Sequence, residues 1–276
     1  MPEYVLGYAT PEQQRLVAQA EHWRHDLIRD GTTLEPGTRL LEVGCGVGAV
    51  MAVLGEEFPG IDLTGVDIEA RQLAFARTHL AEAGVKATLM QADALSLPFD
   101  DQSFDHVWMM WFLEHLADPV AALREARRVL APGGAITAIE VDYSTCQADP
   151  STANLEALFS TMVQGMADRG RSDAGTHLPR WLVEAGFGEV DPGERRVWWK
   201  GAELERQANY AADVMESALG AMVELPGASS EQQLRRGLAD LRGLVDQPGS
   251  GLGWTIHKSH ACRGRFESRP AAGKTC

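Results

Sequence analysis

The chain has 276 residues, of which 45% are hydrophobic and 23% are charged, and its formal net charge is −14. This composition indicates a globular protein with one large domain, or with a core domain and a smaller one. The negative charge opposes contact with phosphate backbones, so we expect no nucleic acid as a main partner. The sequence has neither a signal-peptide pattern nor an apolar stretch that would span a bilayer, so we expect a cytoplasmic protein without a membrane partner.

The first half of the chain alternates short apolar segments with helical patterns. Thr10-Pro11 is a helix start signal, and apolar residues then recur at helical spacing, which predicts a helix over residues 11–30. The predicted strands are residues 39–43, 63–67, 86–90, 104–109 and 135–141. Strands that alternate with helices in this way are typical of an α/β fold with a doubly wound, mostly parallel sheet.

The second half is richer in helical patterns. We expect helices over residues 151–169, 179–185, 203–223 and 234–245. A sixth strand is predicted over residues 190–200 and a last strand over residues 253–262. The segment from Gly264 onward is rich in Arg, Pro, Gly and Ala, and we expect it to be disordered.

The most informative segment is LLEVGCGVG, residues 40–48, in which an apolar strand runs into a turn of alternating glycines. Glycine lets a backbone approach a ligand closely because it has no side chain. Ala49 also allows a G-x-G-x-x-A dinucleotide pattern, so the turn by itself leaves two kinds of nucleotide ligand open. Cys45 lies inside this turn, where a small space-filling residue is favoured over a reactive nucleophile.

Carboxylates follow the next strands at the edge where an open α/β sheet binds ligands. Asp67 ends the second strand, where an ionised acid would suit the two hydroxyls of a ribose. Asp93 follows the third strand, where it could accept a hydrogen bond from an adenine amine, and Ile68 could cover the base. Each residue alone has a structural alternative, because acidic residues often cap helices at such turns.

These motifs together resemble the class I S-adenosylmethionine-dependent methyltransferases. The matching segments are LLEVGCGVG (40–48), GVDIEA (65–70), QADALSLPFDDQSFDHV (91–107), EHLADP (114–119) and RVLAPGG (128–134). The resemblance implies S-adenosylmethionine as the cofactor, and a Rossmann-like sheet of seven strands whose last strand is antiparallel. A nicotinamide dehydrogenase fits less well, because a pyrophosphate would be repelled by Glu42.

The resemblance also implies a division of the chain and a set of cofactor contacts. Residues 1–35 would form an N-terminal helical lid, 36–200 the cofactor-binding core, 201–250 a helical cap insert, 251–263 the final core strand and 264–276 the tail. Gly44 and Gly46 would pack against the methionine part, Glu42 would hold its amino group, Asp67 the ribose, and Asp93 with Ala94 the adenine. The full set of predicted cofactor-binding residues is Tyr8, Glu42, Gly44, Cys45, Gly46, Asp67, Ile68, Asp93, Ala94 and Trp111.

We expect the acceptor site to be formed by the segments that cover the carboxyl ends of the strands. The candidate bases or catalytic residues are His115, Glu140 and Tyr143. The candidate acceptor-binding residues are Tyr4, Trp23, Asp142, His177, Tyr210 and Met215. The four cysteines lack a C-x-x-C spacing, so no metal site is expected.

We therefore expect methyl transfer to a small, aromatic and natural-product-like acceptor, with an indolic one as a specific guess, at carbon, nitrogen or oxygen. Such a reaction belongs to secondary metabolism. Two alternatives stay open: another reaction that uses S-adenosylmethionine, such as a cyclisation, and a non-catalytic regulator that binds it. The expected assembly is a monomer or homodimer.

Overall fold

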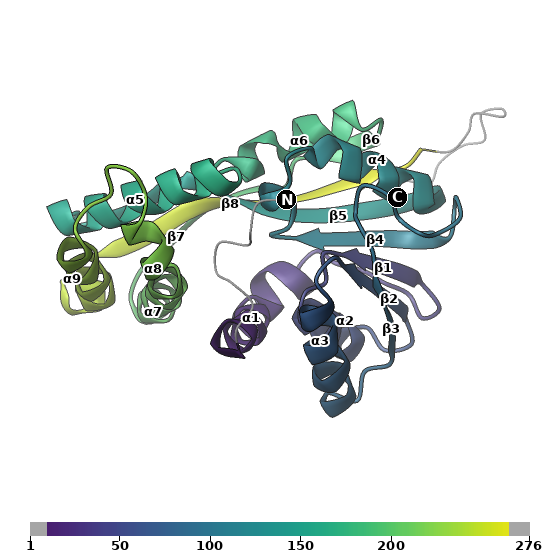
Figure 1. Ribbon diagram of the computed structural model, residues 1–276, viewed down its shortest axis with the longest axis horizontal. Helices are drawn as coiled ribbons and strands as arrows, with labels where there is room; N and C mark the ends of the chain where they lie inside the picture. Colours follow the sequence, from purple (N-terminus) through teal and green to yellow (C-terminus); the bar gives the residue numbers. More distant parts are fainter. Residues whose placement is uncertain (1–9, 265–276) are drawn as a thin grey trace.

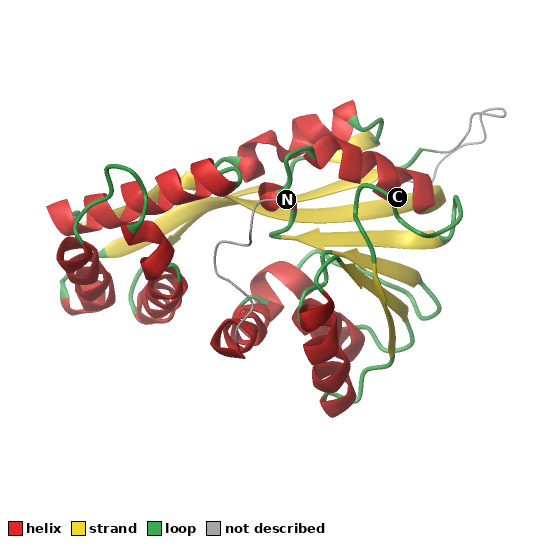
Figure 2. Cartoon of the chain, in the orientation of Figure 1, coloured by secondary structure: helices red, strands yellow, loops and turns green. Residues whose placement is uncertain are grey.

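The computed structural model describes residues 10–264, and its centre is one sheet of eight strands in the order β3-β2-β1-β4-β5-β8-β6, with β7 also paired to β8 (Figures 1 and 2). The strands are β1 (Arg39–Val43), β2 (Asp62–Asp67), β3 (Ala87–Gln91), β4 (Phe104–Met110), β5 (Leu130–Asp149), β6 (Gly188–Asp191), β7 (Glu194–Trp199) and β8 (Gly251–Cys262). Strands β1 to β5 run parallel, and β8 runs antiparallel to its neighbours. The predicted doubly wound α/β class and the antiparallel last strand are confirmed.

The sheet has eight strands instead of the predicted seven because the sixth predicted strand is interrupted. Pro192 and Gly193 separate β6 from β7, and Gly193 has a φ of +56°. A Cβ atom at Gly193 would lie 1.8 Å from the backbone oxygen of Lys258. Only glycine allows this close approach of the two backbones, and the chain continues beside β8 as a second short strand.

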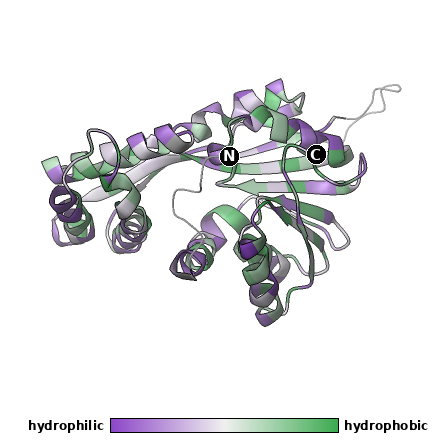
Figure 3. Ribbon diagram, viewed as in Figure 1, coloured by the Kyte–Doolittle hydropathy of each residue, from purple (hydrophilic) through white to green (hydrophobic). Residues whose placement is uncertain are grey.

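Helices cover both faces of the sheet. One face carries α1 (Thr10–His22), α2 (Ala49–Glu57) and α3 (Ala70–Glu82), and the other carries α4 (Pro119–Val129) and α6 (Ala174–Glu184) (Figure 1). Side chains of β4 alternate between the two resulting cores: Trp108 belongs to one and Val107 to the other. The central strands are accordingly mostly apolar (Figure 3).

The predicted helix over residues 11–30 changes its geometry part of the way along. After α1 a wider, π-helical turn runs over Arg24–Arg29, in which the backbone N–H groups of Leu27 and Ile28 both donate to the Trp23 oxygen, at 3.0 and 3.1 Å. The wider turn buries Leu27 and Ile28 against the sheet. It also leaves Trp23 at the end of α1, facing the cavity described below.

Strand β5 is much longer than the predicted strand over residues 135–141. It begins at Leu130, and its far end pairs with β8, where Gln147 is opposite Gly253. The two strands continue beyond the parallel part of the sheet and carry further helices: α5 (Ala153–Arg169), α7 (Ala202–Ser217), α8 (Leu219–Val223) and α9 (Glu231–Arg242) (Figure 1). The predicted helix over residues 203–223 is thus broken at Ala218, which joins α7 to α8.

Helix α6 starts five residues before its predicted first residue, Pro179, so this proline lies inside the helix. The first turn of α6 packs closely on the sheet. A Cβ at Gly175 would lie 2.7 Å from the His257 ring and 3.0 Å from the backbone oxygen of Glu140. No helix in the described part of the chain is long and apolar enough to cross a membrane.

Candidate active site

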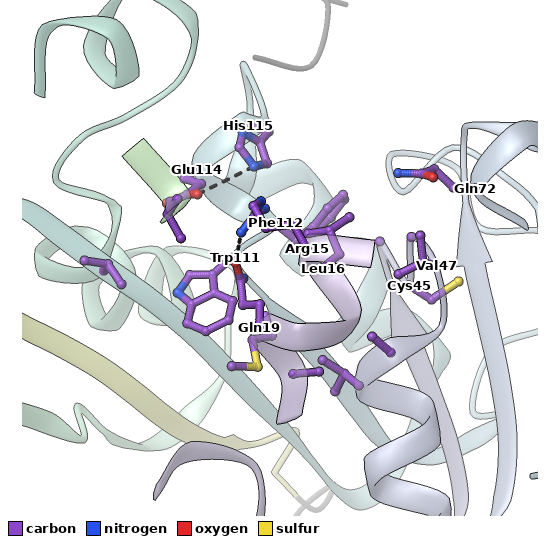
Figure 4. A pocket seen from close by; sticks show the side chains of 18 of the residues that line it. Arg15, Leu16, Gln19, Cys45, Val47, Gln72, Trp111, Phe112, Glu114 and His115 are labelled. Carbon is purple, nitrogen blue, oxygen red and sulfur yellow. Dashed lines mark hydrogen bonds and ion pairs between the residues drawn. The ribbon is translucent and has the colours of Figure 1, made fainter. Parts of the chain in front are cut away.

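A cavity of about 320 Å³ lies at the carboxyl ends of the parallel strands, between α1 and the helices α5, α7 and α8. Of the predicted site residues, it brings together Trp23, Glu42, Gly44, Cys45, Gly46, Asp67, Ile68, Asp93, Ala94, Trp111, His115, Tyr143, Tyr210 and Met215. In the close view, α1 crosses the middle of the cavity with Arg15, Leu16 and Gln19 (Figure 4). Cys45, Val47 and Gln72 lie on one side of α1, and Trp111, Glu114 and His115 lie on the other.

Three predicted site residues do not line this cavity. The Glu140 carboxylate instead accepts hydrogen bonds from the backbone N–H groups of Phe112 and Leu113, at 3.0 and 2.7 Å. Asp142 accepts from Ser144 Oγ and Thr176 Oγ1, each at 2.5 Å.

His177 lies inside α6, two residues before the predicted start of that helix; its Nε2 lies 3.0 Å from Asp173 Oδ2, and its ring stacks on Trp181. Tyr4 and Tyr8 lie outside the described residues.

The glycine turn is held against β2 and leaves open space above it. The backbone N–H groups of Gly44 and Cys45 both donate to the Val66 oxygen, at 2.9 and 3.0 Å. Gly44 and Gly46 have φ angles of +76° and +48°, which favour glycine. A Cβ at Gly44 would lie 2.2 Å from Phe112 Cδ2, whereas one at Gly46 would meet nothing within 4 Å. Both glycines line the cavity, but a side chain at Gly44 would overlap Phe112, whereas one at Gly46 would enter open space.

Asp67 ends β2 with a carboxylate fixed by the backbone. Its Oδ2 accepts from the Gly46 N–H and its Oδ1 from the Glu69 N–H, both at 2.8 Å. Burial raises the pKa of Asp67, and these hydrogen bonds oppose that rise. Two carboxylate oxygens offer about four acceptor positions, so two remain for hydroxyl groups of a ligand.

Glu42 is a buried carboxylate without a counter-charge. It is 3% exposed, and no hydrogen-bond partner for its Oε2 exists within residues 10–264. Burial raises its pKa well above the ordinary value, and the nearby Asp67 raises it further. Such orphaned groups are rare in proteins, because desolvation of the charged form is costly. A cationic amino group of a ligand would supply the missing partner, so the site fits the methionine end of S-adenosylmethionine.

The third strand end is more open. Asp93 is exposed and accepts a hydrogen bond from the Leu95 N–H at 2.9 Å, while Ile68 is 44% exposed. Ala94 lies beside them and is buried. An exposed apolar side chain next to a carboxylate suits a flat, polar-edged base, and these residues fit the adenine end of the same cofactor.

Aromatic side chains form the wall of the cavity on the other side of α1. Trp23 lies edge-on to both Trp111 and Tyr210, with ring centroids 6.2 and 5.6 Å away, and His22 stacks on Tyr210 at 4.1 Å. Trp111 has a φ of +49°, unusual for a large residue, and its N–H donates to the Ile139 oxygen at 2.9 Å. This conformation turns the chain at the end of β4 and leaves the Trp111 ring on the cavity wall.

Behind the aromatic wall the cavity is lined mainly by small and thioether side chains. These include Met222 on α8 and the unpredicted Met162, Gly165 and Met166 on α5; the aromatic Trp254 on β8, also unpredicted, lines the cavity as well. The helical pattern over residues 151–169 was visible in the sequence, but not which face it turns to the cavity. Arg15, Gln19 and Gln72 were also missed, because only the folded chain brings α1 and α3 beside the glycine turn.

Two polar groups of the cavity wall come from the turn Leu113–His115 after β4. Burial lowers the pKa of His115 to about 4, so this imidazole is neutral at physiological pH. Its neighbour Glu114 is 2% exposed and lines the cavity as well, although the sequence analysis passed over it. The motif EHLADP could have indicated Glu114, because this residue directly precedes the predicted site residue His115 and therefore lies near the same cavity wall. Within the described ranges no cluster of His, Cys, Asp and Glu side chains could hold a metal ion.

Comparison with known proteins agrees with this geometry. Residues 41–138 match the family described as "Methyltransferase domain". The demethylmenaquinone methyltransferase of Thermus thermophilus is 38% identical over 102 residues, which are 37% of this chain and 46% of that protein. The 2-methyl-6-phytyl-1,4-hydroquinone methyltransferase of Synechocystis sp. is 39% identical over 102 residues, 37% of this chain and 31% of that protein. The matched region thus spans less than half of either relative.

Among solved structures, the [4+2]-cyclase SpnF aligns with a TM-score of 0.57 and 24% identity, over 90% of this chain and 83% of that one. At that identity the likeness supports the fold alone. The family match covers the glycine turn and the strand ends that form the cofactor side of the cavity. The chain thus contains, over residues 41–138, a methyltransferase domain of the class I S-adenosylmethionine-dependent kind.

Proposed function

We propose that the chain transfers a methyl group from S-adenosylmethionine to a small, apolar and aromatic acceptor. The observation that carries the proposal is one continuous cavity that joins two chemically different ends. One end presents the orphaned Glu42 and the fixed Asp67, and the other presents Trp111, Tyr210 and thioether side chains. Apolar linings with a few fixed polar groups are typical of small-molecule sites.

The residues of the first end would hold the cofactor. Glu42 would pair with its amino group, Asp67 with its ribose, and Asp93 and Ile68 with its adenine. When bound, S-adenosylmethionine supplies an electrophilic methyl group on a sulfonium, and the protein supplies binding and orientation. Orientation of two reactants is worth roughly 7–11 kcal/mol of an activation barrier.

The second end would orient the acceptor and exclude water. Trp23, Trp111 and Tyr210 offer ring faces and edges, which suit an aromatic plane. The methionines on α5, α7 and α8 adapt their shape to irregular apolar groups. The relatives named for demethylmenaquinone and for a phytyl hydroquinone support an aromatic acceptor with an apolar substituent. An indolic acceptor, the specific guess from the sequence, is retained as a member of the same class.

The test combines binding with product analysis. Calorimetry with S-adenosylmethionine and with S-adenosylhomocysteine should give saturable binding that weakens in Asp67→Ala. Incubation with methyl-labelled cofactor and a panel of hydroquinones, phenols and indoles should then yield a labelled product that gains one methyl group. Absence of cofactor binding would refute the proposal. A product that is an isomer of its substrate, with the cofactor unconsumed, would instead favour the cyclisation alternative.

A further inference from the structure

Three polar side chains, those of Tyr143, Glu114 and His115, meet at the proposed acceptor end of the cavity. Glu114 and Tyr143 both line the cavity, and the Tyr143 hydroxyl donates to Glu114 Oε1 across 3.3 Å. His115 Nε2 lies 3.5 Å from the same oxygen, as Figure 4 shows. Because His115 is neutral, it brings no positive charge to balance Glu114.

Behind Glu114 lies a second carboxyl group, that of Glu140. Glu140 is fully buried, and its Oε1 accepts from the backbone N–H groups of Phe112 and Leu113, the two residues that precede Glu114. In the part of the chain that the structure describes, neither the Glu114 Oε2 nor the Glu140 Oε2 atom has a hydrogen-bond partner.

The electrostatics of the pair agree with this arrangement. Burial raises the pKa of Glu140 to about 8 and that of Glu114 well above its usual value, and Glu140 raises the latter further. Because both pKa values are raised, the pair loses its first proton only as pH rises toward about 8. Two adjacent carboxyl groups in an apolar site do not both ionise, so the pair then holds one proton and one negative charge. The backbone donors that fix Glu140 stabilise that charge next to the cavity.

We propose that Tyr143, Glu114 and Glu140 form a proton-accepting chain, and that the acceptor presents an O–H or N–H donor to its cavity end at Tyr143 and Glu114. The inference rests on the proposed function and narrows its substrate class from aromatic molecules in general to phenolic or N–H-bearing ones. Tyr143 and Glu114 would touch the acceptor, and Glu140 acts through Glu114 as a positioning residue.

The acceptor oxygen or nitrogen forms a bond to the methyl carbon, and the carbon–sulfur bond breaks with its electron pair retained by sulfur. The acceptor proton passes to Tyr143 as the Tyr143 proton passes to Glu114, or it passes to Glu114 directly. Either way the carboxyl pair changes from one proton to two and becomes neutral, and it returns one proton to water after the product leaves.

The test uses binding alone, with 2-naphthol and 2-methylnaphthalene as probes and S-adenosylhomocysteine at saturation. The two probes have similar shape, but only 2-naphthol donates a hydrogen bond. A hydrogen bond to a charged group predicts roughly tenfold to hundredfold tighter binding of 2-naphthol to the wild type. Excited 2-naphthol is a strong acid, so contact with a base in a dry cavity should also give naphtholate emission.

Glu114→Gln should lose both the preference and the naphtholate emission, while S-adenosylhomocysteine binds as in the wild type. Tyr143→Phe provides a second, conservative variant that should weaken the emission if Glu114→Gln fails to fold. Glu205→Gln, at an exposed position of α7, is the matched control and should change nothing.

Equal binding of the two probes, no saturable binding of 2-naphthol, or unchanged emission in Glu114→Gln would each overturn the inference. Failure of the wild type to bind S-adenosylhomocysteine would instead refute the proposed function itself.

Discussion

Replacement of Glu42 by Gln should have opposite effects on cofactor binding and on the unliganded protein. Gln keeps the shape of the side chain but removes the charge that would pair with the cofactor amino group. Loss of one partner of a buried ion pair costs about 3–5 kcal/mol. Since 1.4 kcal/mol is about tenfold in affinity, binding of S-adenosylmethionine should weaken by a factor on the order of 10² to 10³.

The unliganded protein should become less sensitive to pH. Burial raises the pKa of Glu42 in the folded state, so between its unfolded and folded pKa values the folded chain binds more protons. Stability from this group is therefore complete below the unfolded pKa and falls as pH rises through the folded pKa. Each unit by which the pKa is raised costs about 1.4 kcal/mol, and Gln, which does not titrate, avoids this cost.

Two measurements test this reasoning. Scanning calorimetry without ligand, from about pH 5 to about pH 8, should show that the difference in Tm between Glu42→Gln and the wild type shifts in favour of the variant as pH rises. Titration calorimetry in two buffers of different ionisation enthalpy should show that the wild type releases a proton on binding S-adenosylmethionine, and that the variant does not. Wild-type affinity in Glu42→Gln, or Tm curves that stay parallel across this pH range, would refute the reasoning. Glu205→Gln is again the matched control.

Three further predictions concern the rest of the site and its support. Gly46→Ala should lower the free energy of unfolding by about 1–2 kcal/mol, because the φ of this residue is positive, and it should abolish cofactor binding. Gly44→Ala should lower the free energy of unfolding by about 2–5 kcal/mol, because its Cβ would also overlap Phe112. Chemical denaturation, together with calorimetry of cofactor binding, should separate the two variants. Asp67→Asn should weaken binding of S-adenosylhomocysteine by roughly tenfold to hundredfold, and an unchanged affinity would contradict the assignment. The variant should also have a lower Tm, because the amide nitrogen of Asn cannot accept one of the two backbone hydrogen bonds. Burial lowers the pKa of Lys258 in the folded chain to about 8, so above that pH the unfolded chain binds more protons than the folded chain. The free energy of unfolding of the wild type should therefore rise between about pH 8 and pH 10 relative to that of Lys258→Met. Denaturation experiments that give both proteins the same dependence on pH would contradict this.

The parallel core could be predicted because its signals are local. Each strand is a short apolar run, each helix has its own periodicity, and the glycine turn and Asp67 lie within a few residues of a strand end. Their meeting at one edge follows from the topology of parallel sheets. The residues predicted from these signals therefore line one cavity, although Arg15, Gln19 and Gln72 beside the glycine turn were missed.

The extension of β5 could not be predicted, because its last residues form a strand only by pairing with Gly251–Gly253, about 100 residues further along the chain. The same applies to the buried pair of Glu114 and Glu140. The sequence around a polar residue in a strand or turn does not indicate whether its side chain is buried. Only the folded chain therefore shows that the carboxyl groups of Glu114 and Glu140 are both buried. His177 was misjudged for a related reason, since packing of Gly175 on the sheet extends α6 beyond its sequence signal.

The continuation of β5, β7 and β8 beyond the parallel sheet has a mechanical consequence for the acceptor site. Helices α5, α7 and α9 join the ends of these paired strands through short connections, so the thioether-lined wall is built onto the same rigid framework as the cofactor-binding edge. Helix α1, by contrast, is joined to its surroundings by side-chain contacts such as Gln13 with Gln72 and His22 with Tyr210. The two walls of the cavity are therefore built differently, one from helices anchored to long paired strands and the other from a helix that packs through side-chain contacts.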